Sequence, residues 1–230
     1  MGMQCHFRGV EFPSYVDELR DIVTTVEPRL RLIPEMRQHV SRFTDGADMD
    51  EVYPKLFLGD CDAATNEAYL LRNGITHILN AADNTSGPAR VKTGAEFYKN
   101  PSIIYQGLDL LDMPFINISV HFEKASEFID EALASGGCIL IHCRQGRSRS
   151  ATIVAAFLML RRNMTAARAL TLLRESREIR PNNGFLQHLA DLDLKLFRAK
   201  FEKLQEEMSS SSDSDSEFDL ESDSESDSSC

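Results

Sequence analysis

Apolar residues along this chain follow two spacings, which alternate from about residue 51 onward. Short apolar runs of strand length occur at 55–59, 75–80, 103–108 and 138–142. Segments of helical length, with apolar residues three or four positions apart or in a continuous apolar run, occur at 14–26, 63–72, 117–133, 151–158, 165–174 and 186–207. This alternation predicts an α/β domain with a central, mostly parallel sheet of four to five strands and helices on both faces.

The segments outside the alternating region differ in composition. We expect residues 1–50 to form an N-terminal extension with one amphipathic helix at 14–26, followed by a polar, irregular connection over 27–51. Residues 208–230 are rich in serine and acidic residues. Their few apolar side chains cannot offset the entropy lost on folding, so we expect a disordered tail. Residues 51–207 are left as the folded domain.

Charge is concentrated in that tail. The chain has a formal net charge of −11, and residues 209–230 carry eight acids and no base, so the rest has a charge of −3. A nearly balanced domain offers no broad basic surface, and we expect no nucleic-acid partner. No run of eighteen apolar residues predicts a transmembrane helix. Five scattered cysteines without an apolar leader favour reduced thiols in the cytoplasm, with access to the nucleus.

The strongest chemical signal is the stretch from His142 to Ser150, which reads His-Cys-Arg-Gln-Gly-Arg-Ser-Arg-Ser. Cys143 directly follows a predicted strand and precedes a predicted helix. Backbone N–H groups converge at such a turn, lower the pKa of a thiol and bind an anion. Arg149 can bind two phosphate oxygens together. The spacing predicts hydrolysis of a phosphate monoester through a cysteinyl-phosphate, which makes residues 51–207 a catalytic domain.

The remaining residues of this stretch have predicted supporting roles. Gly146 permits a backbone turn that a side chain would obstruct. Ser150 can donate a hydrogen bond to the sulfur when it leaves in the second step, and His142 is expected to order the loop rather than to transfer protons. The residues predicted to bind the substrate phosphate are Arg144, Gln145, Gly146, Arg147 and Ser148.

The proton for the leaving oxygen must come from another segment. Asp109 and Asp112 both follow the strand predicted at 103–108, in a loop that can overhang the site. Their positions alone do not separate these two candidates for the general acid. No histidine stands at ligand spacing from a cysteine or an acid, so we predict no metal site.

These features resemble the cysteine-dependent protein tyrosine phosphatases, and within them the atypical dual-specificity phosphatases of the vaccinia H1-related type. The pattern His142-Cys143-x5-Arg149-Ser150 corresponds to the signature loop of that superfamily. Other matching stretches are Gly74–Ala82, Glu96–Lys99, Phe128–Asp130 and Arg177–Asn182. The resemblance covers about residues 52–195 in chain order.

The resemblance implies a dual-specificity protein phosphatase acting on phosphotyrosine, phosphoserine and phosphothreonine in phosphoproteins, without metal or organic cofactor. It assigns the general acid to Asp112 rather than Asp109. It matches Arg177 to an arginine that contacts the second phosphate of a doubly phosphorylated segment, such as those of MAP kinases. An arginine that complements a helix dipole is the equal alternative. Asn182 is expected either to brace the phosphate loop from behind or to be a plain turn residue.

Two other functions stay open at this point. Arg144 and Arg147 add positive charge to the loop, which keeps a phosphoinositide or phosphatidylglycerol-phosphate substrate as the second candidate. A non-catalytic phosphoprotein-binding scaffold is disfavoured, because the cysteine, the arginine and the acid are all present. The serines among the acids of 209–230 suit an acidophilic kinase such as casein kinase 2, although a solubilising tail is the simpler interpretation.

Overall fold

The computed structural model describes residues 14–28, 48–83, 90–98 and 102–211. It divides the chain into two compact units, residues 1–193 and 194–230, with the boundary inside the last helix. This boundary lies before the end of the folded domain expected at 207. Most of the predicted connection, residues 29–47, and most of the predicted tail, residues 212–230, lie outside the described residues.

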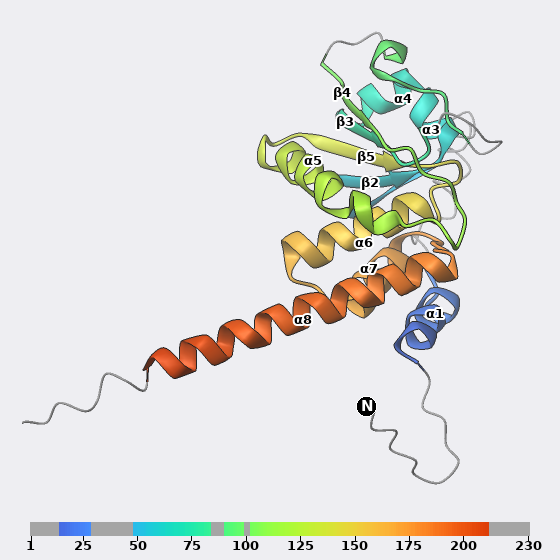
Figure 1. Cartoon of the computed structure of the whole chain (residues 1–230). Coiled ribbons are helices and arrows are strands. Elements are labelled where there is room, and N and C mark those ends of the chain that lie inside the picture. Colours follow the sequence, from blue (N-terminus) through green and yellow to red (C-terminus); the bar gives the residue numbers. More distant parts are fainter. Residues whose placement is uncertain (1–13, 29–47, 84–89, 99–101, 212–230) are drawn as a thin grey trace, which may run out of the picture. The chain divides into compact units, whose positions relative to one another are not determined.

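The first unit is built on a five-stranded sheet with the strand order β1-β2-β5-β3-β4 (Figure 1). The strands are β1 (Met49–Tyr53), β2 (Leu56–Gly59), β3 (Ile75–Asn80), β4 (Ile104–Gly107) and β5 (Cys138–His142). Strands β2, β5, β3 and β4 run parallel, and β1 pairs antiparallel with β2. The predicted α/β class with a mostly parallel sheet is confirmed.

Strand β1 begins at Met49, inside the segment 27–51 that the sequence predicts as an irregular connection, and for these last residues of the connection the prediction is wrong. Within β1 only Met49 and Val52 are buried. An edge strand of this kind is paired on one side only and keeps acidic residues at the surface. Two buried positions three residues apart do not produce the period-two pattern by which strands are recognised.

The helices lie close to their predicted positions. They are α1 (Tyr15–Thr25), α3 (Cys61–Thr65), α4 (Glu67–Arg72), α5 (Phe122–Ala134), α6 (Arg149–Arg162), α7 (Ala166–Ser176) and α8 (Asn183–Ser211), with 3-10 turns η1 (Ala95–Phe97) and η2 (Ile118–His121). The single helix predicted at 63–72 is two helices, because Asn66 ends one and caps the next. Its N–H donates to the carbonyl of Ala63, and its side chain accepts from the N–H of Tyr69.

Helices cover both faces of the sheet, as Figure 1 shows. On one face, Ile78 and Leu140 of the sheet form a buried cluster with Ala64 and Leu70 of α3 and α4. Helices α5 and α6 pack against β5 from the other face. The carboxyl end of β5 therefore lies in the middle of the sheet edge at which α/β proteins bind ligands.

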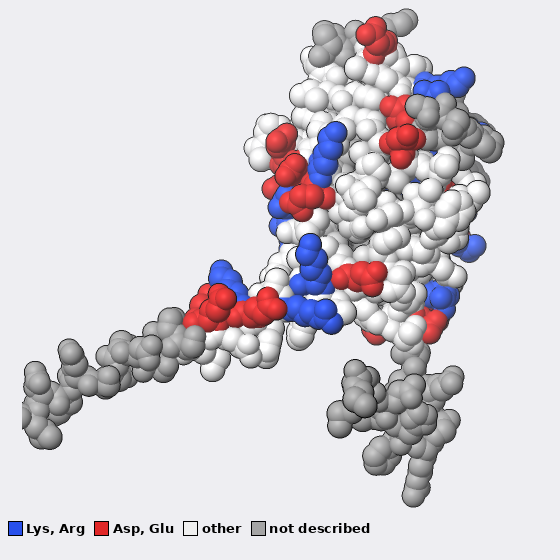
Figure 2. Space-filling view, in the orientation of Figure 1, with Lys and Arg blue, Asp and Glu red and all other residues white. Residues whose placement is uncertain are grey.

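Helix α1 belongs to the first unit and packs on α7. The Nε of Arg174 donates to the carbonyl of Val26 at 2.7 Å, and the hydroxyl of Tyr15 donates to Asp193. On the face in Figure 2, basic and acidic side chains are interspersed over the described surface, which agrees with the nearly balanced charge of the chain outside its tail. None of the helices in the described part of the chain has the length and hydropathy needed to span a bilayer.

Candidate active site

Residues 143–149, which we call the phosphate loop, connect β5 to the first residue of α6. Gly146 has a φ of +66°, in the left-handed region that favours glycine. A Cβ atom at this position would lie 2.3 Å from the carbonyl oxygen of Gly59 and 2.9 Å from Nη2 of Arg177. The turn therefore requires glycine, both for its backbone conformation and for the space around it.

Cys143 is buried, with 2% of its surface exposed. Burial is the largest influence on its pKa and raises it. The charge of Arg149, the Ser150 hydroxyl and the N–H groups of Ser150 and Arg147 together outweigh burial and hold the pKa of the Cys143 thiol below its ordinary 9.0. The Ser150 Oγ lies 3.3 Å from the sulfur, as its predicted role requires. The thiolate of Cys143 is thus more readily formed than that of a free cysteine, although the side chain is buried.

Arg149 is also 2% exposed, and its guanidinium faces the loop that follows β4. Its Nη1 donates to the carbonyl of Leu110 at 3.2 Å, and its Nε lies 3.6 Å from Oδ2 of Asp112. This Nε–H has no hydrogen-bond partner among the described residues. Buried N–H groups are nearly always paired, so a donor left over beside a thiolate is available for a substrate oxygen.

Asp112 lies in the acid loop, our name for residues 108–117 between β4 and η2. Its Oδ1 accepts two hydrogen bonds, from the Ser148 hydroxyl at 2.8 Å and from Nδ2 of Asn182 at 2.9 Å. Its Oδ2 is left as the oxygen that can carry a proton. Asp109 is exposed, and its charge acts on the ring of His121. The structure thus brings Asp112, and not Asp109, to the phosphate loop.

The start of α8 holds the acid loop in this position. Asn182 accepts from the N–H of Phe185 at 3.1 Å and so caps α8 while it binds Asp112. Gly184 lies so close to the acid loop that an added Cβ would come within 1.8 Å of the carbonyl oxygen of Pro114. In Figure 1 the segment after β4 runs to the start of α8. Asn182 therefore contacts the acid rather than bracing the phosphate loop from behind.

Arg177 lies behind the phosphate loop, where its guanidinium holds four oxygens. It donates to the carbonyls of Gly146 at 2.9 Å and Gln145 at 3.2 Å, and forms ion pairs with Asp48 at 2.9 Å and Asp50 at 2.8 Å. The residue is 6% exposed. The expected contact with a second substrate phosphate does not fit this buried, fully engaged guanidinium. Although Arg177 is the C-cap of α7, the partners of its guanidinium are the loop carbonyls and the two aspartates, and none of them is a carbonyl of the last turn of that helix.

The chain matches the family described as "Dual specificity phosphatase, catalytic domain" over residues 56–194. Dual specificity protein phosphatase 13B of Homo sapiens is 46% identical over 151 residues, which cover 65% of this chain and 75% of that protein. This chain belongs to the dual-specificity phosphatases. It is a hydrolase, and phosphoproteins are its substrates.

Two solved structures support the same conclusion. Human DUSP28 aligns with a TM-score of 0.56 and 30% identity over 64% of this chain and 94% of that one. A mouse putative dual specificity phosphatase complexed with zinc tungstate aligns with a TM-score of 0.58 and 28% identity over 66% of this chain and 90% of that one.

The other predicted residues of this phosphatase have different surroundings. Arg144 and Gln145 are exposed. Arg147 donates through Nε to the carbonyl of Glu178 at 3.1 Å and pairs with the Glu178 carboxylate, which also binds Arg180 at 2.9 Å. The single carboxylate of Glu178 is shared by two guanidiniums, so it offsets one of these two positive charges.

His142 lies at the end of β5 and is fully buried. Burial, assisted by the charge of Arg149, lowers the pKa of its imidazole to about 4. The ring is neutral at physiological pH, and neither ring nitrogen has a hydrogen-bond partner among the described residues, so the loop-ordering role stays a prediction.

Sequence analysis missed two parts of this site. It gave no role to Gly184, although a glycine after two asparagines marks a close backbone approach. It also gave no role to Asp48 and Asp50, because the segment before β1 carries no strand pattern.

Proposed function

We propose that Cys143, Arg149 and Asp112 carry out the phosphatase reaction in two steps. In the first, the Cys143 thiolate attacks phosphorus and the bond from phosphorus to the substrate oxygen breaks. Asp112 donates a proton from Oδ2 to that oxygen, so the product leaves as a neutral serine, threonine or tyrosine hydroxyl. Arg149 binds two equatorial oxygens of the phosphoryl group throughout.

In the second step the Asp112 carboxylate removes a proton from water, and the oxygen of that water attacks the cysteinyl-phosphate. The sulfur–phosphorus bond breaks, inorganic phosphate leaves and Cys143 returns to the thiolate, which the Ser150 hydroxyl stabilises. The observation that carries this proposal is the buried Nε–H of Arg149, which makes no hydrogen bond among the described residues and lies 3.6 Å from Oδ2 of Asp112, beside a thiol of lowered pKa.

The hydrogen bonds of Asp112 suit both roles of the acid. Ser148 and Asn182 occupy one carboxyl oxygen, so the proton is directed to the other, which faces Arg149. The mouse relative solved with zinc tungstate supports an oxoanion site in this family, since tungstate and phosphate are both tetrahedral. We expect tungstate to inhibit this enzyme competitively.

Phosphoproteins are favoured over lipids because only part of the basic charge of the loop is free. Glu178 pairs with both Arg147 and Arg180 and so offsets one of these two charges, while Arg144 is the exposed basic side chain of the phosphate loop. A phosphoinositide headgroup carries several phosphates, and binding it requires more uncompensated positive charge than the phosphate loop offers.

Turnover of purified protein on phosphopeptides and on phosphoinositide vesicles tests the proposal. We expect phosphopeptides to be hydrolysed at least tenfold faster, and Cys143→Ser to abolish turnover of both. Activity retained in Cys143→Ser would overturn the mechanism, whereas faster lipid turnover that the variant abolishes would overturn only the substrate class.

Three finer points are part of the same proposal. Doubly phosphorylated segments, such as those of MAP kinases, remain candidate substrates, with Arg144 rather than Arg177 as the accessible guanidinium for the second phosphate.

An acidophilic kinase acts on the serines of residues 209–230. The enzyme works in the cytoplasm with access to the nucleus, which imaging of a tagged full-length chain would test.

A further inference from the structure

The second half of α8 exposes a regular row of large apolar side chains. Leu194, Phe197, Phe201, Leu204 and Met208 are between 49% and 74% exposed. The intervals between them are three, four, three and four residues. The rings of Phe197 and Phe201 stack with centroids 6.5 Å apart, so the row forms one continuous surface. We call these five residues the α8 seam.

The spacing of the α8 seam is that of the a and d positions of a coiled coil. Helices with this repeat bury the row against a second helix that carries the same repeat. In the first half of α8 the apolar residues Phe185, Leu186 and Leu189 are fully buried within the first unit. From Leu194 onward the seam stays exposed, and contiguous apolar surface of this kind marks an interaction site.

The polar residues beside the seam are complementary in an antiparallel pair of identical helices. When Phe201 of one copy packs against Leu204 of the other, the two g positions that face each other are Lys200 and Glu207. This contact occurs twice by symmetry, so the pair gains two interactions between opposite charges. Glu207 also pairs with Lys203 of its own helix at 3.9 Å, in an ion pair whose two side chains are largely exposed. The same alignment sets Phe197 against Met208, so four of the five seam residues gain an apolar neighbour, and Leu194 lies beyond the paired stretch.

The area of the seam agrees with a dimer of modest stability. Each large side chain presents about 150–250 Å² when fully exposed. The four paired residues are 50–74% exposed, so they bury on the order of 450 Å² per copy, or about 900 Å² in total, which is the size of a weak, reversible interface. A seam of about two heptads predicts dissociation in the micromolar range.

We propose that the α8 seam is a dimerisation surface, occupied by the α8 seam of a second copy of this chain in antiparallel orientation. The proposal does not depend on the catalytic mechanism, because none of the seam residues belongs to the active site. It predicts that the phosphatase is a monomer when dilute and a dimer when concentrated.

Sedimentation velocity of the full-length chain from about 2 to 200 µM tests this. We expect wild type to shift from monomer to dimer, and Phe201→Glu to stay monomeric. Ala199→Glu places the same carboxylate on the opposite, exposed face of α8 and should dimerise like wild type. All three should hydrolyse an aryl phosphate equally, which shows that the catalytic unit is folded. A wild-type monomer at 200 µM, as expected if residues 29–47 or another protein cover the seam, would overturn the proposal.

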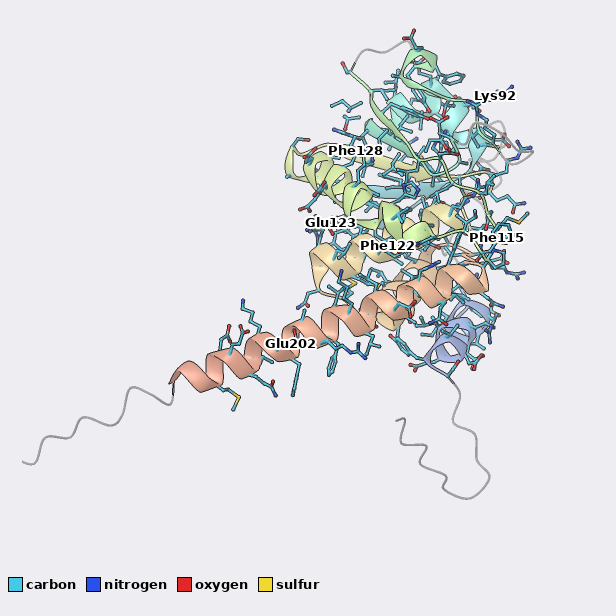
Figure 3. All side chains as sticks on the ribbon, in the orientation of Figure 1. Lys92, Phe115, Phe122, Glu123, Phe128 and Glu202 are labelled. Carbon is cyan, nitrogen blue, oxygen red and sulfur yellow. The ribbon has the colours of Figure 1, made fainter. Side chains whose placement is uncertain are left out.

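The orientation has its own test. Lys200→Glu and Glu207→Lys should each raise the dissociation constant about threefold or more, because each places like charges together. The double variant exchanges the two charges and should restore the wild-type value. In a parallel pair Lys200 faces Gln205, so failure of the double variant to restore dimerisation would overturn the antiparallel arrangement. Glu202 (labelled in Figure 3) lies outside the g and e positions, and Glu202→Lys serves as the matched control.

Discussion

The phosphate loop and the acid loop supply the two halves of one reaction, but they are built in different ways. The phosphate loop is a continuous run of residues between the central strand and a buried helix. The acid loop owes its position to side chains far away in sequence. Asp112 is held by Ser148, 36 residues later, and by Asn182, 70 residues later. Gly184 fixes the backbone beside it.

Because the two loops have different roles, damage to the phosphate loop and damage to the acid loop should cause different catalytic defects. The phosphate loop activates the nucleophile and binds the phosphoryl group, so its loss affects every substrate equally. The acid loop delivers a proton, and the need for that proton depends on the leaving group. An aryl phosphate that leaves as a stable phenolate needs it little, whereas phosphoserine needs it in full. The ratio of the two activities therefore reports which loop is damaged.

The largest effect is expected in the phosphate loop. Arg149→Lys keeps the charge but loses the planar fork that binds two oxygens together. We expect kcat/KM to fall on the order of 10³-fold for both an aryl phosphate and a phosphoserine peptide. A loss below tenfold on either substrate would contradict the role of the guanidinium.

Asp112→Asn should reduce hydrolysis of a phosphoserine peptide by about 10²–10³-fold. The loss on an aryl phosphate with an acidic phenol should be about tenfold or less. The descending limb of the pH–rate profile, which requires a protonated carboxyl, should disappear. Asp109→Asn is the matched control and should keep the wild-type values. Equal losses on the two substrates would mean that Asp112 supports the phosphate loop rather than the leaving group.

Gly184→Ala should reproduce this pattern without touching a reacting group. The new Cβ must push Pro114, and Asp112 with it, away from the phosphate loop. A displacement of about 1 Å costs on the order of 10–10²-fold on the phosphoserine peptide. The aryl phosphate activity and the rate of thiol alkylation should change little. Gly94→Ala is the control, because Gly94 has no atom within 4 Å of the new Cβ. Slower alkylation in Gly184→Ala would show that the damage reaches the phosphate loop.

The same difference explains what the sequence could predict. The strands, the helices around the sheet and the chemistry of residues 142–150 follow from local patterns, so they could be predicted. The acid could not be chosen from position alone, because Asp109 and Asp112 stand in equivalent places along the loop. Their separation depends on contacts with α8, and no local pattern encodes a contact made 70 residues away.

The acid loop also exposes side chains that sequence patterns could not place. Leu111, Met113 and Phe115 are 38%, 48% and 80% exposed, although apolar residues beside a catalytic acid would be expected to be buried. Figure 3 labels Phe115 on this loop. Their exposure follows from the contacts of Asp112 and Pro114, which fix the backbone of the loop and leave the flanking side chains at the surface.

Arg177→Ala tests the phosphate loop without changing a residue of the loop itself, since Arg177 donates to two of its carbonyls. Removal of the guanidinium leaves two loop carbonyls and two carboxylates without their partner. We expect kcat to fall about tenfold on both substrates, with destabilisation of about 1–3 kcal/mol in urea unfolding from the loop carbonyls that lose their donor. A loss confined to KM for doubly phosphorylated peptides would instead restore the second-phosphate role.

The smallest effect concerns stability rather than turnover. The pKa of His142 is about 4 in the folded protein and 6.5 in the unfolded chain, so the unfolded chain binds the proton more readily. His142 therefore lowers stability as the pH falls from about 6.5 to about 4, and has no further effect below that range. The full difference is about 3 kcal/mol.

His142→Asn should remove this pH dependence. We expect its free energy of unfolding, measured in urea at pH 7 and pH 4.5, to fall less on acidification than that of wild type. The volume lost in the variant lowers its stability at both pH values, so only the difference between them is informative. If the two proteins lose the same free energy of unfolding between pH 7 and pH 4.5, His142 is protonated in the folded state at pH 4.5. The end of β5 beneath the phosphate loop would then be open to water.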